Sequence, residues 1–390
     1  MTSYCLSHGR ELRRRDRRAS LDYWQKWVDA DSHAAEPRIE LVVDLIDVGT
    51  FKAIQTANIV LKEAEVLIAA TDKILRGQLC YCHSMVKFQE GNWAEGLVAL
   101  NYARQQFDGA PSGIALCDEA AGIYEMGMGN FADAQSNFEQ SLAYHLEVDD
   151  AVAKGMSYYY LGRLYMLMDE PDMAADFIDM ALVIGKEEPD RLLHLKAQIV
   201  LAEFWIYQQR YDTALELIEV AEELLRPEVD DLRRAYLWCD RAEALFGLGQ
   251  YDRSLEVLKR EATPQMREKQ HPLGCAIAKE LRGRVLLYRL MQEEGVPNEE
   301  SLEAIEDIFL DASMVFEQQG MKRQFASTLY HLAQLYSLTT PLPSSYQYQG
   351  KRLRALELAL SVLQQQPVGN GRLIAELERL MDESMGMGHP

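Results

Sequence analysis

The sequence predicts an all-α protein, a solenoid of stacked helical hairpins. Three observations favour this class. The stretch from Leu161 to Ala181 carries apolar residues three and four positions apart on both sides of a turn at 169–171, which is the pattern of two short amphipathic helices. Similar turns recur about 40 residues apart, and regular repetition of this kind is typical of stacked repeats. No segment has the alternating apolar pattern of a β-strand.

The hairpin at 161–181 explains why repetition is needed. Pro171 suits the start of its second helix, because the first helical position leaves its N–H unpaired in any case. Gly162 and Ala174 are small enough for the two backbones to approach closely. A hairpin of this size cannot bury its own apolar stripe, so it needs neighbours of the same design.

The repeated turn is a small or polar pair followed by an aromatic residue or proline. It marks the middle of six successive hairpins, spaced at about 40 residues. The six turns are Gly49-Thr50-Phe51, Gly91-Asn92-Trp93, Gly129-Asn130-Phe131, Asp169-Glu170-Pro171, Gln209-Arg210-Tyr211 and Gly249-Gln250-Tyr251.

These units resemble the tetratricopeptide repeat (TPR), over roughly residues 36–366. The best unit matches at Leu161, Gly162, Tyr165, Ala174 and Ala181, with Ile178 and Pro171 in two aromatic places. The flanking matches are Gly122, Gly129, Asn130, Phe131, Ala134 and Phe138 before it and Trp238, Ala242, Gly249, Tyr251 and Leu258 after it, where Arg241 and Ser254 depart from the pattern. The usual unit has about 34 residues, so these helices or loops are longer. The resemblance implies a right-handed superhelix whose concave groove is lined by the first helix of each hairpin.

Composition narrows the class of partner. The chain has 390 residues, 48% hydrophobic content and a net charge of −21. That charge argues against binding of nucleic acid or anionic membranes. No apolar run is long enough to cross a bilayer, and the N-terminus lacks the apolar core of a signal peptide, so we expect a cytoplasmic protein. The six cysteines lack the spacing of a disulfide framework and are expected to be free.

Residues 1–35 are expected to form an arginine-rich arm followed by a capping helix. The arm holds six arginines, and Leu21, Trp24 and Val28 form the apolar stripe of the helix that covers the first repeat. Two interpretations of the arginines stay open at this point. The arm grips an acidic partner or nucleic acid, or it is the solvated start of a helix, with or without docking on the acidic surface of the protein itself.

Regular repeats are expected over 36–261. The first two hairpins are predicted at 37–48 with 50–70 and at 72–90 with 93–107, followed by an irregular loop at 109–113. Residues 262–274 contain two prolines and are predicted to be an irregular connection, the place where the solenoid would bend.

Less regular hairpins are expected over 275–366. Their helices are predicted at 275–290, 301–319, 322–338 and 350–366, with an insert at 293–298 and a long loop at 339–349 as a candidate binding element. Residues 367–390 are expected to hold a capping helix at 371–381 and a frayed tail at 386–390.

The sequence lacks the common motifs of enzymes and of cofactor sites. The sequence has no His-Glu-x-x-His zinc helix, no Gly-x-Ser-x-Gly nucleophile turn and no phosphate-binding loop ending in Gly-Lys-Ser/Thr. Cys80, Cys82 and His83 do not share one helix face, which disfavours a zinc site. We therefore expect no catalysis, no cofactor and no metal.

The resemblance to TPR proteins instead implies candidate binding residues on the concave face. They combine tyrosines with charged groups and carry two more negative than positive charges, which favours a neutral or basic peptide or protein segment as partner. The candidates are Tyr81, Met85, Glu119, Ile123, Tyr159, Arg163, Lys196, Glu203, Tyr236, Asp240, Glu243, Glu280, Arg284, Tyr330 and Gln334.

The leading hypothesis is a non-catalytic scaffold or adaptor that captures a polypeptide in this groove. The Lys/Asn/Lys/Arg clamp of chaperone-tail adaptors is not recognisable at the comparable positions. An alternative is a peptide-responsive regulator, because the layout is similar to that of bacterial Rap-type regulators, although the short N-terminal region has no counterpart of their catalytic bundle. A third is the regulatory subunit of a larger effector complex.

Overall fold

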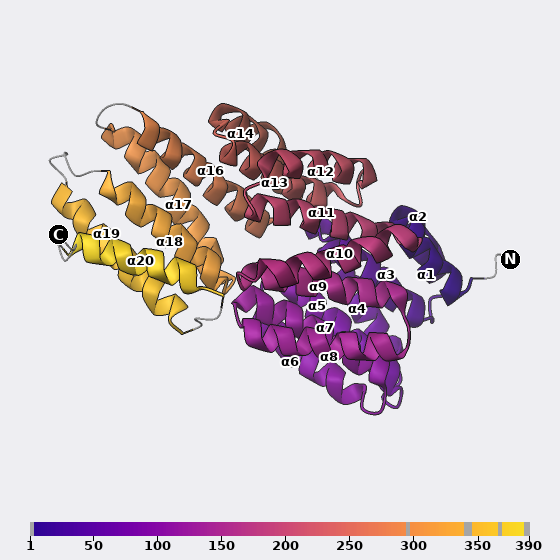
Figure 1. The fold of residues 1–390 in the computed structure, drawn as a ribbon. Helices are drawn as coiled ribbons and strands as arrows, with labels where there is room; N and C mark the ends of the chain where they lie inside the picture. Colours follow the sequence, from indigo (N-terminus) through magenta and orange to yellow (C-terminus); the bar gives the residue numbers. More distant parts are fainter. Residues whose placement is uncertain (1–3, 294–296, 339–344, 366–368, 386–390) are drawn as a thin grey trace.

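The structure is a computed structural model that describes residues 4–293, 297–338, 345–365 and 369–385. Within these ranges the chain is built of helices and contains no strand, which confirms the all-α prediction (Figure 1). The helices are α1 (Leu6–Arg15), α2 (Arg17–Ala30), α3 (Glu36–Val48), α4 (Phe51–Leu67), α5 (Lys73–Gln89), α6 (Trp93–Gln106), α7 (Pro111–Met128), α8 (Phe131–Glu147), α9 (Ala151–Leu167), α10 (Pro171–Glu187), α11 (Arg191–Tyr207), α12 (Tyr211–Leu224), α13 (Asp231–Gly247), α14 (Tyr251–Val257), the π-helix η1 (Leu258–Ala262), α15 (Thr263–Glu268), α16 (Pro272–Gln292), α17 (Glu299–Gln318), α18 (Lys322–Ser337), α19 (Ser345–Leu363) and α20 (Gly371–Ser384).

The six repeated turns have the same backbone conformation. In each one the first residue has a positive φ, between 58° and 84°. Glycine adopts this left-handed conformation without steric cost, and it occupies four of the six positions. Asp169 and Gln209 adopt it with a side chain, and the Asp169 carboxylate accepts a hydrogen bond from the Tyr207 hydroxyl of the next hairpin. The repeat predicted from local turn chemistry is therefore the repeat of the fold.

Close packing inside each hairpin depends on small residues. A Cβ atom on Gly162 would lie 2.7 Å from Cγ1 of Ile178, and one on Gly122 would lie 2.5 Å from the Phe138 ring. Neither position has room for a larger side chain, because overpacking a dense core displaces its neighbours. The predicted close approach of the helices around Gly162 is thus confirmed.

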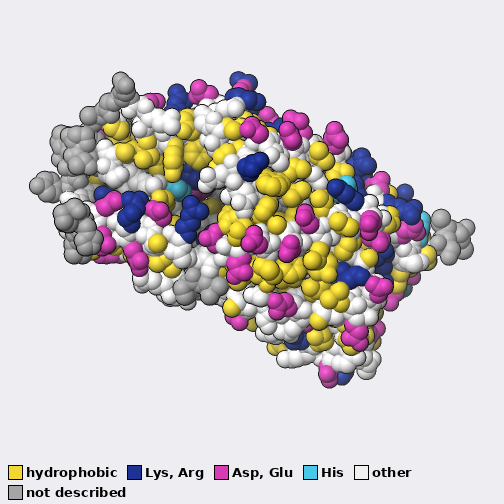
Figure 2. Space-filling view, in the orientation of Figure 1, with side chains coloured by type: hydrophobic (Ala, Val, Ile, Leu, Met, Phe, Trp, Pro, Cys, Tyr) yellow, Lys and Arg dark blue, Asp and Glu magenta, His cyan; other side chains and the backbone are white. Residues whose placement is uncertain are grey.

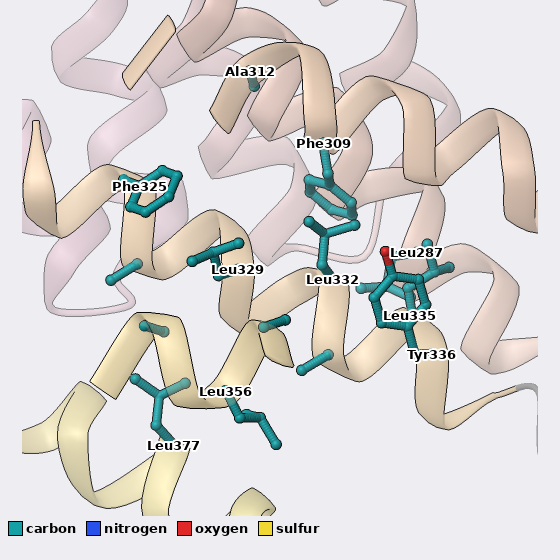
Figure 3. Packing of buried hydrophobic residues seen from close by; sticks show 14 of the residues in the cluster. Leu287, Phe309, Ala312, Phe325, Leu329, Leu332, Leu335, Tyr336, Leu356 and Leu377 are labelled. Atoms are coloured by element: carbon teal, nitrogen blue, oxygen red, sulfur yellow. The ribbon is translucent and has the colours of Figure 1, made fainter. Parts of the chain in front are cut away.

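Apolar residues between successive hairpins form the core, which runs along the solenoid. At the C-terminal end Phe309, Leu332 and Leu356, on three successive helices, are all at most 1% exposed. Figure 3 shows Phe309 and Leu332 side by side, with Leu356 of α19 and Leu377 of α20 below them. Leu377 and Leu380 of α20 are buried in this end of the core.

The N-terminal region forms the two helices α1 and α2 rather than an arm and one helix. Trp24 of α2 is fully buried, and Gly9 of α1 lies against its ring, where a Cβ atom would be 2.2 Å from the indole. Arginines of α1 and α2 pair with carboxylates of α3 (Arg10 and Arg13 with Glu40, and Arg17 with Asp47). Three of the six arginines thus pair with the protein's own acidic side chains on α3.

Two predicted irregular segments are wrong in part. Helix α7 begins at Pro111, because proline suits a first helical position, and Gly113 packs inside it with the Phe107 ring in the space of a Cβ. The predicted connection at 262–274 is helical as far as Glu268: η1 and α15 continue α14, and Pro264 lies in the first turn of α15. Only residues 269–271 link this helix to α16.

Three other predictions concern segments that are not fully described. Residues 294–296 of the insert, 339–344 of the long loop and the tail at 386–390 lie outside the described residues. The end of the predicted loop, from Ser345 onward, is instead helical and forms the start of α19.

Successive turns of the superhelix contact each other. Arg233 of α13 donates a hydrogen bond of 2.8 Å to the carbonyl of Asp47, and the amide of Phe51 donates one of 3.2 Å to the carbonyl of Lys269. Farther along, Arg323 of α18 donates to the carbonyl of Leu167 at the end of α9. These contacts join residues more than 150 positions apart and hold the solenoid in a closed form.

Candidate functional site

The first helices of the central hairpins, α5, α7, α9, α11 and α13, line a trough. Two of the cavities along it hold most of the predicted residues. The central cavity has a volume of about 330 Å³ and is lined by Tyr159, Arg163, Lys196, Ile199, Glu203, Arg233, Tyr236, Asp240 and Ile277. The basic cavity has a volume of about 370 Å³ and is lined by residues of α1, α2, α3, α5, α7, α9 and α11, with Lys196 common to both.

The structure brings ten of the predicted concave residues together around these two cavities. Regular helical spacing explains this, since one position per turn of each first helix faces the same side. The ten residues are Tyr81, Met85, Glu119, Ile123, Tyr159, Arg163, Lys196, Glu203, Tyr236 and Asp240. Of these, Tyr159 is only 9% exposed, so it forms part of the wall more than a contact surface.

Arg163 stands at the centre of the trough. Its Nε lies 3.3 Å from the Glu203 carboxylate, and its Nη1 donates a 3.2 Å hydrogen bond to the Tyr159 hydroxyl. The Glu203 carboxylate is the main cause that raises the pKa of Arg163 above its ordinary value. The guanidinium is therefore oriented by protein groups and stays charged.

Asp240 is the carboxylate of the central cavity that has no partner. It makes no hydrogen bond or ion pair within the described part of the chain, and Glu203 and Glu243 lie near it. Burial, followed by the negative charges of Glu203 and Glu243, raises its pKa well above the ordinary value, while Arg163 acts in the opposite direction. A positively charged ligand group beside Asp240 would stabilise the ionised carboxylate and so lower its pKa.

Because the Asp240 carboxylate has no partner, we expect its replacement by a neutral side chain to stabilise the folded protein. A carboxyl whose pKa is raised in the folded state gives full stability below its unfolded pKa and loses stability as the pH rises. We therefore expect Asp240→Asn to raise the melting temperature at pH 8, by roughly 2 °C, and to leave it unchanged at pH 4. Calorimetry at both pH values measures this.

Glu243→Gln is the matched control for Asp240→Asn. Glu243 receives two hydrogen bonds from Arg284, of 2.6 and 3.2 Å, so its neutralisation weakens a formed pair and lowers the melting temperature at pH 8. An Asp240→Asn protein no more stable than the parent at pH 8 would contradict the assignment.

The remaining predicted residues lie outside the two cavities. Arg284 is held by Glu243 and lies 3.7 Å from Glu280, and Glu280 lies 3.6 Å from Nε2 of His331. Burial raises the pKa of Glu280 to about 7, and burial lowers that of His331 to about 3. Tyr330 and Gln334 bond each other at 2.9 Å. These groups form an internal polar chain, and Nη1 and Nη2 of Arg284 are both committed to Glu243.

The basic cavity has a different electrostatic character. Lys196 lies over the rings of Tyr159 and Tyr160, at 5.7 and 5.9 Å from their centres. Burial lowers the pKa of Lys196 to about 8, and burial raises the pKa of Glu119 to about 7. Both groups are thus poorly solvated and are positioned to respond to a charged ligand.

Sequence reasoning missed the contribution of the N-terminal helices to the trough. Arg10, Arg13, Arg14 and Arg17 line the basic cavity, and Arg233 lines the central one. The arginine run was the available signal, but its position beside α11 depends on contacts between distant segments.

Metal centres and membrane-spanning helices are two other classes of site to consider in the described residues. Among the described residues no group of three or more His, Cys, Asp or Glu side chains is placed to hold a metal ion. None of the described helices combines the length and apolar character needed to span a bilayer.

Comparison with known proteins identifies the fold. No protein-family model and no curated protein sequence matches the chain. A Rap protein complexed with competence and sporulation factor is similar in structure, with a TM-score of 0.59 and 12% identity over 90% of this chain and 99% of that one. NprR in complex with its cognate peptide NprX gives 0.55 and 13% over 90% and 98%.

A signal transduction ATPase with a tetratricopeptide repeat sensor, from Pyrococcus horikoshii, gives a TM-score of 0.54 and 13% identity over 90% of this chain and 52% of that one. The identities are low, and the shared feature is the helical architecture. The chain therefore has the fold of the tetratricopeptide-repeat solenoids, as its repeated turns and hairpins predicted.

Proposed function

We propose that this protein is a non-catalytic interaction scaffold that captures a neutral to basic polypeptide segment in its trough. The observation that carries the proposal is the central cavity, where the unpartnered Asp240 lies among tyrosine, isoleucine and oriented charged side chains. A polypeptide offers both the apolar area for Tyr236 and Ile199 and a cationic group for Asp240.

The shape of the trough fits an extended ligand. The two cavities share Lys196 and together extend from α5 to α16, so one elongated segment reaches both of them. The fold likeness supports the same class of ligand, because the similar Rap protein is complexed with competence and sporulation factor and NprR with its cognate peptide NprX.

The test is capture of binding partners by the full chain, followed by measurement of their affinity. We expect a segment with a dissociation constant of micromolar or better, and about tenfold weaker binding to Asp240→Asn, since an ion pair in a poorly solvated site is lost. If Asp240→Asn binds more weakly while it is at least as stable as the parent, the lost affinity comes from the binding site and not from unfolding. Equal affinity for both proteins would contradict the role of Asp240.

A second candidate function is peptide-responsive regulation, in which the captured segment changes the shape of the solenoid. The observation that favours it is the set of contacts between successive turns, which includes Arg233 with Asp47 and Arg323 with Leu167. Of these groups, Arg233 lines the central cavity and Asp47 lines the basic cavity.

Small-angle scattering with and without a captured peptide tests this second function. A ligand that favours one arrangement of the turns changes the radius of gyration, and the Arg233→Ala protein responds less because one contact between turns is missing. An unchanged radius at saturating peptide would leave the simple scaffold as the function. Mass spectrometry of captured proteins would show whether the partner belongs to a larger effector complex.

A further inference from the structure

The basic cavity is lined by five cationic side chains and only three carboxylates, those of Asp47, Glu119 and Asp190, so positive charge is in excess. Arg10 and Arg13 are paired with Glu40, and Asp190 is occupied as the N-cap of α11. In contrast, Arg14 and Lys196 form no ion pair within the described residues, although both line this cavity. The excess of charge comes from two different parts of the chain that meet here.

Arg17 is a second and independent sign of a missing anion. Its side chain is only 4% exposed and its Nη1 pairs with the Asp47 carboxylate, yet its Nε has no hydrogen-bond partner among the described residues. A buried guanidinium normally satisfies its donors, because an unsatisfied buried donor costs free energy. Burial is also the main cause that lowers the pKa of Arg17 to about 10, with Arg233 and Arg13 acting in the same direction and Asp44 against them.

The cavity is open to a ligand from the trough. Tyr81, Met85 and Ile123 form its apolar wall, and Lys196 connects it to the central cavity. The Asp47 carboxylate is shared between Arg17 and Arg233, so it does not neutralise the remaining cations.

We propose that the basic cavity is an anion subsite in which Arg14, Arg17 and Lys196 bind a carboxylate of the captured polypeptide. This inference rests on the proposed function, and it sets the orientation of the bound segment along the trough. A basic part of the segment lies at Asp240, and a carboxylate lies near the N-terminal helices. The expectation of a neutral to basic partner counted only first-helix positions and omitted the arginines of α1 and α2.

Three pools of randomised seven-residue peptides provide the test on the full-length chain. One pool has free C-terminal carboxylates, the second has C-terminal amides, and the third has amides with one glutamate fixed near the C-terminus. Each pool is passed over the immobilised protein, and bound peptides are quantified by mass spectrometry. We expect at least tenfold enrichment of a carboxylate-bearing pool over the plain amide pool, and the first and third pools distinguish a terminal from a side-chain carboxylate.

The affinities of the recovered peptides for point variants complete the test. We expect Arg14→Ala and Lys196→Met each to weaken binding about tenfold. Arg15→Ala is the matched control, because Arg15 is exposed on the same helix, pairs with Glu11 and lies outside the cavity, and it should change the affinity less than twofold.

Two results would overturn the inference in distinguishable ways. Equal recovery of all three pools, with binding sensitive to Asp240→Asn but not to Arg14→Ala, would refute the anion subsite and leave the scaffold function intact. Recovery of no peptide from any pool would contradict the scaffold function, and the subsite with it.

Discussion

Asp44→Ala is expected to destabilise the N-terminal part of the protein by about 3–5 kcal/mol, the cost of removing one partner of a buried ion pair. The Asp44 carboxylate is fully buried, pairs with Arg13 and accepts a 2.5 Å hydrogen bond from the Ser20 hydroxyl. Without it, the guanidinium groups of Arg13 and Arg17 lose a neighbouring negative charge in a poorly solvated place. Helices α1 and α2 should then separate from α3.

Denaturant unfolding and limited proteolysis measure this effect. We expect a lower free energy of unfolding and rapid cleavage within residues 6–30. Asp22→Ala is the control, since Asp22 is an exposed residue of α2, and its effect should stay within about 0.5 kcal/mol. A protein with Asp44→Ala that resists protease as well as the parent would show that these ion pairs do not hold the N-terminal helices.

The second large effect is expected in binding. Tyr236 and Arg163 both line the central cavity, and tyrosine and arginine are the residues that most often dominate interface energies. The double variant Tyr236→Ala/Arg163→Ala should weaken partner binding by a hundredfold or more, which corresponds to a loss of about 2.7 kcal/mol. Isothermal titration with the captured segment measures the change.

A matched double variant shows whether the effect depends on the trough or would follow the loss of any tyrosine and any arginine. Tyr102 on α6 is 57% exposed, and Arg282 on α16 is exposed, and neither lines the two cavities. Tyr102→Ala/Arg282→Ala should bind as tightly as the parent. If both double variants kept full affinity while folded, the trough would not be the binding site.

The repeat was predictable from sequence because its turns are encoded locally. A residue that tolerates a positive φ, followed by an aromatic residue or proline, sets the end of one helix and the start of the next within four positions. The concave residues from Tyr81 to Asp240 followed from the resemblance to tetratricopeptide repeats, whose register was laid on the sequence once the turns were placed. The same logic failed at 262–268, where a π-helical turn carries the chain into a helix that contains Pro264.

The charge of the trough was not predictable in this way. Arg17 lies in the cavity wall because α2 packs on α3, and Arg233 reaches Asp47 from 186 positions away. Arg284 was expected to face a ligand, but Glu243 on a neighbouring helix holds its guanidinium. Such pairs depend on how the superhelix closes, and neither spacing nor composition contains that information.

The outer surface provides a reference for the final test. Hydrophobic side chains are exposed over α10 and α12, including Met180, Val183 and Val220, and Figure 2 shows a broad apolar area on this face. An apolar ligand that bound without use of the trough would find ample area there.

Photo-crosslinking tests most directly whether the trough holds a polypeptide. A photoreactive amino acid is placed either at Ile199, which lines the central cavity, or at Val183, which is 53% exposed on the outer face. We predict that irradiation of the full chain with its captured partner joins the partner to position 199 and not to position 183. Crosslinks at position 183 with none at position 199 would contradict capture in the trough.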